Sequence, residues 1–282
     1  MRRIWSFGSI NADHAYRVPH IPRPGETLAA RGYTLGLGGK GANQSVAAAR
    51  AGADVRHIGL VGRDGFWAVD RMRALGVDVT HVQAGDVPTG HAIICVDDAG
   101  ENAITIFSGA NRANDLGHVT AALAGAVAGD LLLLQNETNL VGDSARIGRE
   151  QGLFVIYSAA PFDAEAVRDV LPHVSLLILN AVEAAQLQAT LGNLPAGLTV
   201  VVTKGADGAD WVGPDLTLHM PAVKVTVVDT TGAGDTFAGY LAAGLAEGMD
   251  PEAAMALATR AAAIKVTRAG TADAIPARAE VS

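Results

Sequence analysis

The sequence predicts an α/β protein with a mostly parallel central sheet. Short runs rich in leucine and β-branched residues alternate along the chain with alanine-rich amphipathic stretches, an order typical of β-α-β units. These runs are apolar almost without interruption, as in strands that helices cover on both faces. The expected strands are residues 3–7, 55–61, 131–134, 153–157, 176–179, 199–203 and 223–228.

Two regions, at about 13–35 and 88–107, interrupt this alternation. The first contains Pro19, Pro22 and Pro24 within extended sequence, and the second reads as two strands joined by the turn 97–100. Neither region has a helical stretch that could cover it. We therefore expect a small antiparallel β-sheet beside the main sheet, with one face that needs another partner.

Composition narrows the class of protein. The 282 residues contain 49% apolar residues, and no linker, repeat or block of like charge divides them, so we expect a single domain over residues 1–282. The net charge of -8 argues against partners such as nucleic acid or an anionic membrane surface. No run is long enough to span a bilayer, and the single cysteine, Cys95, excludes a disulfide within the chain. A cytoplasmic protein is expected.

The most informative motif lies at residues 229–237, where two glycines precede a predicted helix over 237–247. Gly232 and Gly234 let the backbone approach a ligand closely, and the unpaired N–H groups of a first helical turn attract phosphate. Asp235 lies in the same turn, where its carboxylate could take a proton from an attacking hydroxyl. The alternative is that Asp235 only caps the helix and the glycines only make a tight turn.

A second glycine cluster, at 38–44, also leads into a helix, expected over 45–51. The first strand ends nearby in small and polar residues at 8–13, at the sheet edge where α/β proteins bind ligands. Residues 36–41 fit a dinucleotide fingerprint, with Asp64 at the required distance. That interpretation is disfavoured because the glycines do not follow the first core strand directly. The glycine-lysine pattern of a P-loop is absent from the sequence.

Together these segments resemble the ribokinase-like (PfkB) family of carbohydrate kinases, and its ribokinase branch in particular. The resemblance extends from about residue 4 to residue 276, and its further motifs, in the family's order, are 24–27, 100–102, 109–111, 180–183 and 266–268. It implies a three-layer α/β sandwich in which the small antiparallel sheet is a lid over the sugar. It also implies a homodimer in which the lids of two subunits clasp each other.

The resemblance further implies roles for individual residues. Asp235 would be the general base, and the backbone at Gly232, Ala233, Gly234 and Asp235 would form the anion hole. The positions that match the family's sugar-binding residues are Asn11, Asp13, Gly39, Lys40, Asn43 and Glu137. Carboxylates and amides at these positions suit the hydroxyls of a polyol.

ATP and Mg²⁺ are the implied cofactors. The family's Asn-x-x-Glu motif matches Asn180 and Glu183, whose carboxylate would hold magnesium through water. The positions that match the family's nucleotide-binding residues are Asn180, Thr203, Lys204, Gly205, Ala206, Gly234 and Thr259. Thr259 replaces the Asn or His that often borders adenine in the family, which leaves the nucleotide preference open.

The family also has a potassium site beside the anion hole, formed by an aspartate side chain and backbone carbonyls. The matching positions are Asp229, Thr231, Lys265, Arg268 and Gly270. We expect K⁺ to bind with the Lys265 ammonium pointing away from the ion, more weakly than with a full shell because Ala274 stands where a serine hydroxyl could complete it.

The expected activity is ATP-dependent phosphorylation of the 5-hydroxyl of D-ribose. Another pentose, deoxyribose, another sugar or a nucleoside stays open, because one side chain can switch a hydroxyl contact. A binding module that keeps the fold without catalysis is the non-enzyme alternative. The presence of Asp235 and both glycines disfavours it.

Overall fold

A nine-stranded sheet forms the centre of the computed structural model, which describes residues 2–192 and 197–281. Its strand order is β13-β12-β11-β10-β9-β8-β1-β4-β5. All pairs from β11 to β5 are parallel, and β12 and β13 add antiparallel strands at one edge, which confirms the predicted mostly parallel sheet. The strands are β1 (Ile4–Phe7), β4 (Val55–Gly62), β5 (Asp78–Gly85), β8 (Leu131–Gln135), β9 (Phe154–Ser158), β10 (Leu176–Asn180), β11 (Thr199–Thr203), β12 (Ala209–Val212) and β13 (Thr217–Met220).

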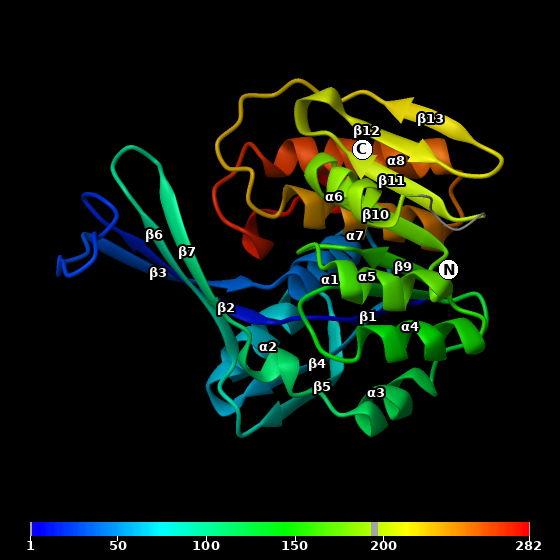
Figure 1. Cartoon of the computed structure of the whole chain (residues 1–282), viewed down its shortest axis with the longest axis horizontal. Coiled ribbons are helices and arrows are strands. Elements are labelled where there is room, and N and C mark those ends of the chain that lie inside the picture. Colours follow the sequence, from blue (N-terminus) through cyan, green and yellow to red (C-terminus); the bar gives the residue numbers. More distant parts are fainter. Residues whose placement is uncertain (1, 193–196, 282) are drawn as a thin grey trace.

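Helices cover both faces of this sheet, as the uninterrupted apolar strands require (Figure 1). Along β8, Leu131 and Leu133 belong to one hydrophobic cluster and Leu132 and Leu134 to the other. The first cluster contains side chains of α1 (Lys40–Arg50), α2 (Phe66–Ala74), α7 (Ala233–Glu247), α8 (Pro251–Lys265) and the short α9 (Arg278–Val281). The second contains those of α3 (Leu116–Leu123), α4 (Val141–Glu150), α5 (Ala164–Val170) and α6 (Ala181–Leu191). The result is the expected three-layer sandwich.

A separate four-stranded sheet projects from the body (Figure 1). It consists of β3 (Gly32–Gly38), β2 (Asn11–Arg17), β6 (Gly90–Val96) and β7 (Asn102–Phe107), in that order. The β2–β3 and β6–β7 pairs are antiparallel, as predicted, whereas β2 and β6 run parallel. Every residue of β7 is exposed. We call this sheet the lid.

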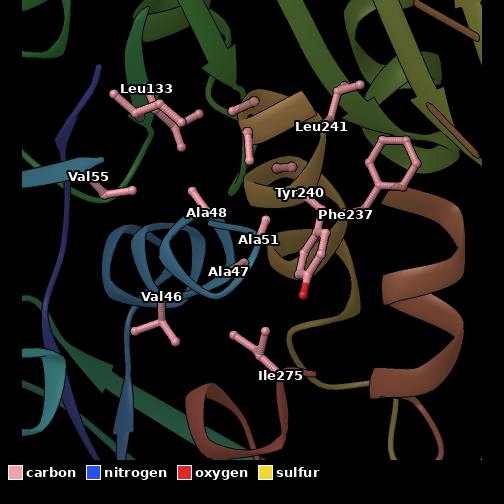
Figure 2. Close-up of a cluster of buried hydrophobic side chains, with 14 of the residues drawn as sticks. Val46, Ala47, Ala48, Ala51, Val55, Leu133, Phe237, Tyr240, Leu241 and Ile275 are labelled. Atoms are coloured by element: carbon pink, nitrogen blue, oxygen red, sulfur yellow. The ribbon is translucent and has the colours of Figure 1, made fainter. Parts of the chain in front are cut away.

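Helices α1 and α7 pack closely in the main core, and this contact brings the two glycine clusters together. Ala47 of α1, and Ala51 just after its end, lie beside Tyr240 of α7 (Figure 2). At Gly239, a Cβ atom would lie 2.4 Å from the Gln44 carbonyl oxygen and 2.5 Å from the Ala47 Cβ. Only a glycine opposite an alanine permits this approach, because atoms in a packed core cannot overlap.

One predicted strand is wrong. Residues 223–228 lie in a segment without regular secondary structure that pairs with no strand of the sheet, and the side chains of Val223, Val225 and Val227 are exposed. A β-branched run needs a neighbouring strand to become part of a sheet, and here β13 already forms the edge. The chain instead runs to Val228, whose N–H donates to the carbonyl of Val266, 2.8 Å away.

In the part of the chain that the structure describes, no helix combines the length and apolarity needed to cross a bilayer.

Candidate active site

The N-terminus of α7 presents unpaired backbone donors. Gly232 adopts the left-handed conformation (φ 74°) and is the N-cap of the helix, so a residue with a side chain would be strained there. At Gly234 a Cβ would point into open space, which leaves room for a ligand. The predicted donor Ala233 is already engaged, because its N–H donates to the Thr230 carbonyl at 3.1 Å. The anion hole therefore consists of the N–H groups of Gly234 and Asp235, which have no acceptor within the helix.

The Asp235 carboxylate is buried and held by two amides of α1. The Asn43 side chain donates to Asp235 Oδ2 at 3.1 Å, and the Gln44 side chain donates to Asp235 Oδ1 at 3.0 Å. Gln44 in turn accepts a bond from Gln135 Nε2 at 2.8 Å. Asn43 Oδ1 is buried without a partner among the described residues, so it can accept a substrate hydroxyl. This geometry holds the Asp235 carboxylate beside the unpaired N–H groups at the start of α7.

The start of α1 packs against the end of β1. At Gly41 a Cβ would lie 2.6 Å from the Gly8 Cα, so both glycines are needed for this approach. Glu137 accepts a bond from the Lys40 N–H at 2.9 Å and one from the Ser9 hydroxyl. Gly39, at φ 89°, shapes the turn between β3 and α1. These contacts bring Gly39, Lys40 and Glu137 to the same edge of the sheet as Asp235.

Asn11 and Asp13 lie on β2 of the lid, two positions apart and therefore on the same face. Asn11 Oδ1 accepts a bond from Asn111 at 2.7 Å, and Asn111 also accepts the N–H of Ile10. Burial, together with the negative charges of Glu137 and Asp235, raises the pKa of the Asp13 carboxyl to about 7. Such a perturbed carboxyl close to other buried carboxylates is typical of a functional site.

The Lys40 side chain interacts electrostatically with carboxylates on several elements of the site. The negative charge of Asp235 raises the pKa of the Lys40 ammonium, burial opposes this, and Glu137 and Glu183 add to the rise. Glu183 belongs to the segment expected to hold magnesium. The Lys40 ammonium is therefore attracted by the negative charges of Asp235, Glu137 and Glu183 together.

Asn180 and Glu183 form a capping box at the start of α6. Asn180 Oδ1 accepts the N–H of Glu183, and Glu183 Oε2 accepts the N–H of Asn180, both at 2.8 Å. Burial raises the pKa of Glu183. Among the described residues, no group of three His, Cys, Asp or Glu side chains is placed to hold a metal directly. Any magnesium would therefore be held mainly by water and phosphate, as Mg²⁺ prefers.

A cavity of about 590 Å³ lies on the other side of the anion hole. Five of the seven predicted nucleotide-binding positions line it: Thr203, Gly205, Ala206, Gly234 and Thr259. Thr259 Oγ1 is buried without a partner among the described residues. Asn180 and Lys204 are not among the lining residues, and the Lys204 ammonium pairs with Asp210 instead of reaching toward the cavity.

The valines of the segment 223–228 contribute to the same cavity. Val223, Val225 and Val227 line it together with Phe237 and Val266. This apolar wall suits a flat base, while the anion hole at the opposite end suits its phosphates. Thus the segment wrongly expected as a strand forms part of the wall of this cavity.

The positions expected to bind potassium converge on one turn, with one difference from the expectation. Asp229 accepts the N–H groups of Thr231 and Gly270, each at 2.9 Å, while the Arg268 side chain turns away to Glu280. The prediction that the Lys265 ammonium points away is wrong. It donates to the Asp229 carbonyl at 3.0 Å, because α8 ends directly beneath this turn.

Comparisons with known proteins agree with this geometry. The model of the pfkB family carbohydrate kinases matches residues 1–278. The chain belongs to this family. It is an ATP-dependent carbohydrate kinase, as the sequence motifs imply.

Among the relatives of this kinase, a Haemophilus influenzae ribokinase is 37% identical over 97% of this chain and 95% of its own length. A Salmonella typhi deoxyribokinase is 32% identical over 95% and 94%. The crystal structure of a Cryptococcus neoformans ribokinase in complex with ADP matches with a TM-score of 0.88 and 31% identity, over 100% of this chain and 99% of that one. An Arabidopsis thaliana ribokinase complexed with ribose and ATP matches with a TM-score of 0.86 and 27% identity, over 99% and 97%.

The structure of this kinase adds site residues that the sequence reasoning did not assign. Gln44 donates to the Asp235 carboxylate, Ser9 bridges Glu137 and the Gly41 N–H, and Asn111 donates to Asn11. Gln44 directly follows Asn43 in the glycine cluster, and Asn111 ends a family motif. The sequence could have indicated Gln44 and Asn111 only through their places within these motifs. Their hydrogen-bond partners, Asp235 and Asn11, lie 100 or more residues away in the sequence.

Proposed function

We propose that this kinase transfers the γ-phosphoryl group of ATP to the 5-hydroxyl of D-ribose. Asp235 accepts the hydroxyl proton as the sugar oxygen attacks phosphorus, and ADP leaves. The N–H groups of Gly234 and Asp235 stabilise charge on the transferring group. The observation that supports this most directly is the buried Asp235 carboxylate, held by two amides in the helical turn that also forms the anion hole.

The polar groups on the lid side of Asp235 support a sugar as the acceptor. Asn11, Asp13, Lys40 and Asn43 lie around the base, and among them they offer both donors and acceptors to hydroxyl groups. A site built to bond hydroxyls rejects analogues that lack them. The presence of ribokinases among the relatives, one with bound ribose and ATP, favours ribose.

The apolar cavity supports the placement of ATP. Its Thr203–Ala206 turn and valine wall would hold the base and ribose of the nucleotide, and Thr259 would bond a polar edge of the base. Magnesium would be held through water by Glu183, with Asn180 orienting that carboxylate. When bound, Mg²⁺ neutralises charge on the ATP phosphates.

Deoxyribose is the main alternative acceptor, because a deoxyribokinase is about as similar to this chain as several ribokinases are. A nucleoside, or another sugar, is the next. The test is a panel of pentoses, deoxyribose, hexoses and nucleosides at equal concentration with Mg·ATP, with mass spectrometry of the products and NMR to assign the phosphorylated oxygen. A kcat/KM for ribose at least about tenfold above that for deoxyribose is expected. A higher kcat/KM for any other acceptor would show that this acceptor, and not ribose, is the preferred substrate.

We also propose that the whole chain acts as one kinase domain in a cytoplasmic homodimer joined through the lids. By strand register, Tyr33 and Leu35 of β3 lie on the same lid face as Ile93 of β6 and Phe107 of β7. All four side chains are exposed. An apolar face of this kind fits a second copy of itself, because isologous contacts make such a patch self-complementary.

Sedimentation velocity tests the dimer. The unmodified protein should sediment as a dimer at micromolar concentration, and Leu35→Glu should sediment as a monomer, since it places a charge in the interface. The control Val127→Glu alters another exposed apolar residue, far from the lid. A monomer for the unmodified protein would rule out the proposed assembly.

A further inference from the structure

Lys265 is the last residue of α8 and is fully buried, with 0% of its surface exposed. An ammonium without water needs close oxygen partners, because the loss of hydration is costly. The partner that the structure provides is the backbone carbonyl of Asp229, 3.0 Å from Nζ. Burial lowers the pKa of the Lys265 ammonium, and the negative charge of the Asp229 carboxylate opposes this shift in part. This buried cation belongs to no part of the mechanism described so far.

Asp229 begins the turn that leads into the anion hole. Its carboxylate accepts the N–H groups of Thr231 and Gly270, and its own N–H donates to the Val266 carbonyl at 3.1 Å. The chain then passes through Thr231 to the left-handed Gly232 and into α7. The direction of the donors in the anion hole therefore depends on how firmly this turn is held at Asp229.

A free monovalent cation does not fit well beside this arrangement. Both carboxylate oxygens of Asp229 already accept backbone N–H groups, and the Lys265 ammonium occupies the carbonyl. A second positive charge close to a buried ammonium would be repelled strongly, since the surrounding dielectric is low. K⁺ and an ammonium group have the same charge and both bind carbonyl oxygens, so one can replace the other.

We propose that the Lys265 ammonium acts as a tethered monovalent cation that orders the Asp229 turn, so that catalysis needs no added potassium. Lys265 is thus a positioning residue. It does not contact the reacting atoms but sets the direction of the anion-hole donors.

The first test is the unmodified kinase in potassium, sodium and choline chloride at fixed ionic strength. Equal kcat values, within about twofold, are expected, as is the same melting temperature in all three salts. The melting temperature reports on ion binding whatever the sugar acceptor is. Activation of several-fold by K⁺, or a melting temperature raised by K⁺ alone, would overturn the proposal without affecting the assignment of the substrate.

Two variants then separate the charge from the volume of the side chain. Lys265→Met removes the charge but fills the space, and kcat should fall at least about tenfold while the KM for sugar changes little, because the anion hole acts on the transition state. Lys265→Ala opens a space, so K⁺ or methylammonium should restore part of its kcat and raise its melting temperature. These cations should not rescue Lys265→Met.

Arg260→Ala is the matched control. Arg260 lies on the same helix and also donates to a backbone carbonyl, that of Val281 at 3.1 Å, but away from the anion hole. Its kcat should be unchanged and insensitive to the cation. Retention of kcat in Lys265→Met, or failure of every cation to act on Lys265→Ala, would show that the ammonium only stabilises the fold. If Lys265→Ala does not fold, the salt series and Lys265→Met still decide the question.

Discussion

Gln44 and Asp235 are 191 residues apart in the sequence, and the Gln44 amide donates to the Asp235 carboxylate across 3.0 Å. The contact exists because Gly239 lets α7 approach α1 at the Gln44 carbonyl. One packing contact in the core thus determines the geometry of the proposed base. The consequences can be measured separately for the base and for the residue that holds it.

Asp235→Asn should fold normally and lose most turnover. The change keeps the size of a side chain that is buried between two amides, but it removes the proton acceptor, which typically costs about 10² to 10⁴ in rate. Steady-state kinetics, with circular dichroism as the check on folding, measure this. If the folded variant keeps a kcat close to the unmodified value, Asp235 is not the base.

Gln44→Leu should lower kcat by about tenfold and leave the KM values for ATP and sugar nearly unchanged. The base loses one of its two orienting donors, whereas the substrate contacts remain. Gln44→Glu should be worse, by about a hundredfold, since it places a carboxylate beside Asp235. Gln188→Leu, on the exposed side of α6, is the control. A rise in KM equal to the loss in kcat/KM would instead assign Gln44 to sugar binding.

Most of the main sheet could be predicted from the sequence because its central strands are buried on both faces. Each of Leu131, Leu132, Leu133 and Leu134 is fully buried, so the run is apolar without interruption and its ends are visible. The sequence does not predict β5, β12 and β13, because exposed and buried residues mix along β5 and β12 and no residue of β13 is buried. Burial on both faces, and not β-propensity, was the informative signal.

The predicted strand over 223–228 illustrates the opposite error. Its valines favour a strand, but pairing depends on a neighbouring strand that only the tertiary structure supplies. The same limit applies to the site. The glycine clusters indicated two ligand-binding turns, whereas the contacts of Gln44 and of the Lys265 ammonium depend on how helices pack.

His57 should make the kinase less stable in mild acid. The ring is buried between the Ser45 hydroxyl and the Gly8 carbonyl, and burial lowers its pKa to about 4. A depressed histidine contributes stability that is complete above the unfolded value of about 6.5 and is lost as the pH falls toward 4. The expected loss from this group between pH 7.5 and pH 5 is about 2 kcal/mol.

Urea unfolding at both pH values, for the unmodified protein and for His57→Gln, isolates this contribution. Glutamine can still bond the neighbouring groups but does not titrate, so its free energy of unfolding should fall less on acidification. Groups that titrate elsewhere affect both proteins alike. Parallel profiles would mean that His57 does not drive the acid sensitivity.

Asp13 should couple sugar binding to a proton. Its pKa of about 7 in the free protein lies above the ordinary value of 3.8, so this group stabilises the fold fully below about pH 3.8 and loses that contribution as the pH rises through 7. Sugar hydroxyls donate to the charged carboxylate and favour it. Binding should therefore release a proton near pH 7, and affinity for the sugar should fall as the pH drops from 7 to 6.

Calorimetry in buffers of different ionisation enthalpy measures the released proton directly. Asp13→Asn should bind sugar more weakly, by about 1 to 3 kcal/mol at pH 8, and should release no proton. Glu101→Gln changes an exposed acid at the tip of the lid and should behave as the unmodified protein does. Proton release that persists in Asp13→Asn would show that Asp13 is not the group that titrates on sugar binding. The Asp13 carboxylate must be charged before the sugar hydroxyls can donate to it. In the unmodified protein the KM for sugar should therefore follow the titration of Asp13.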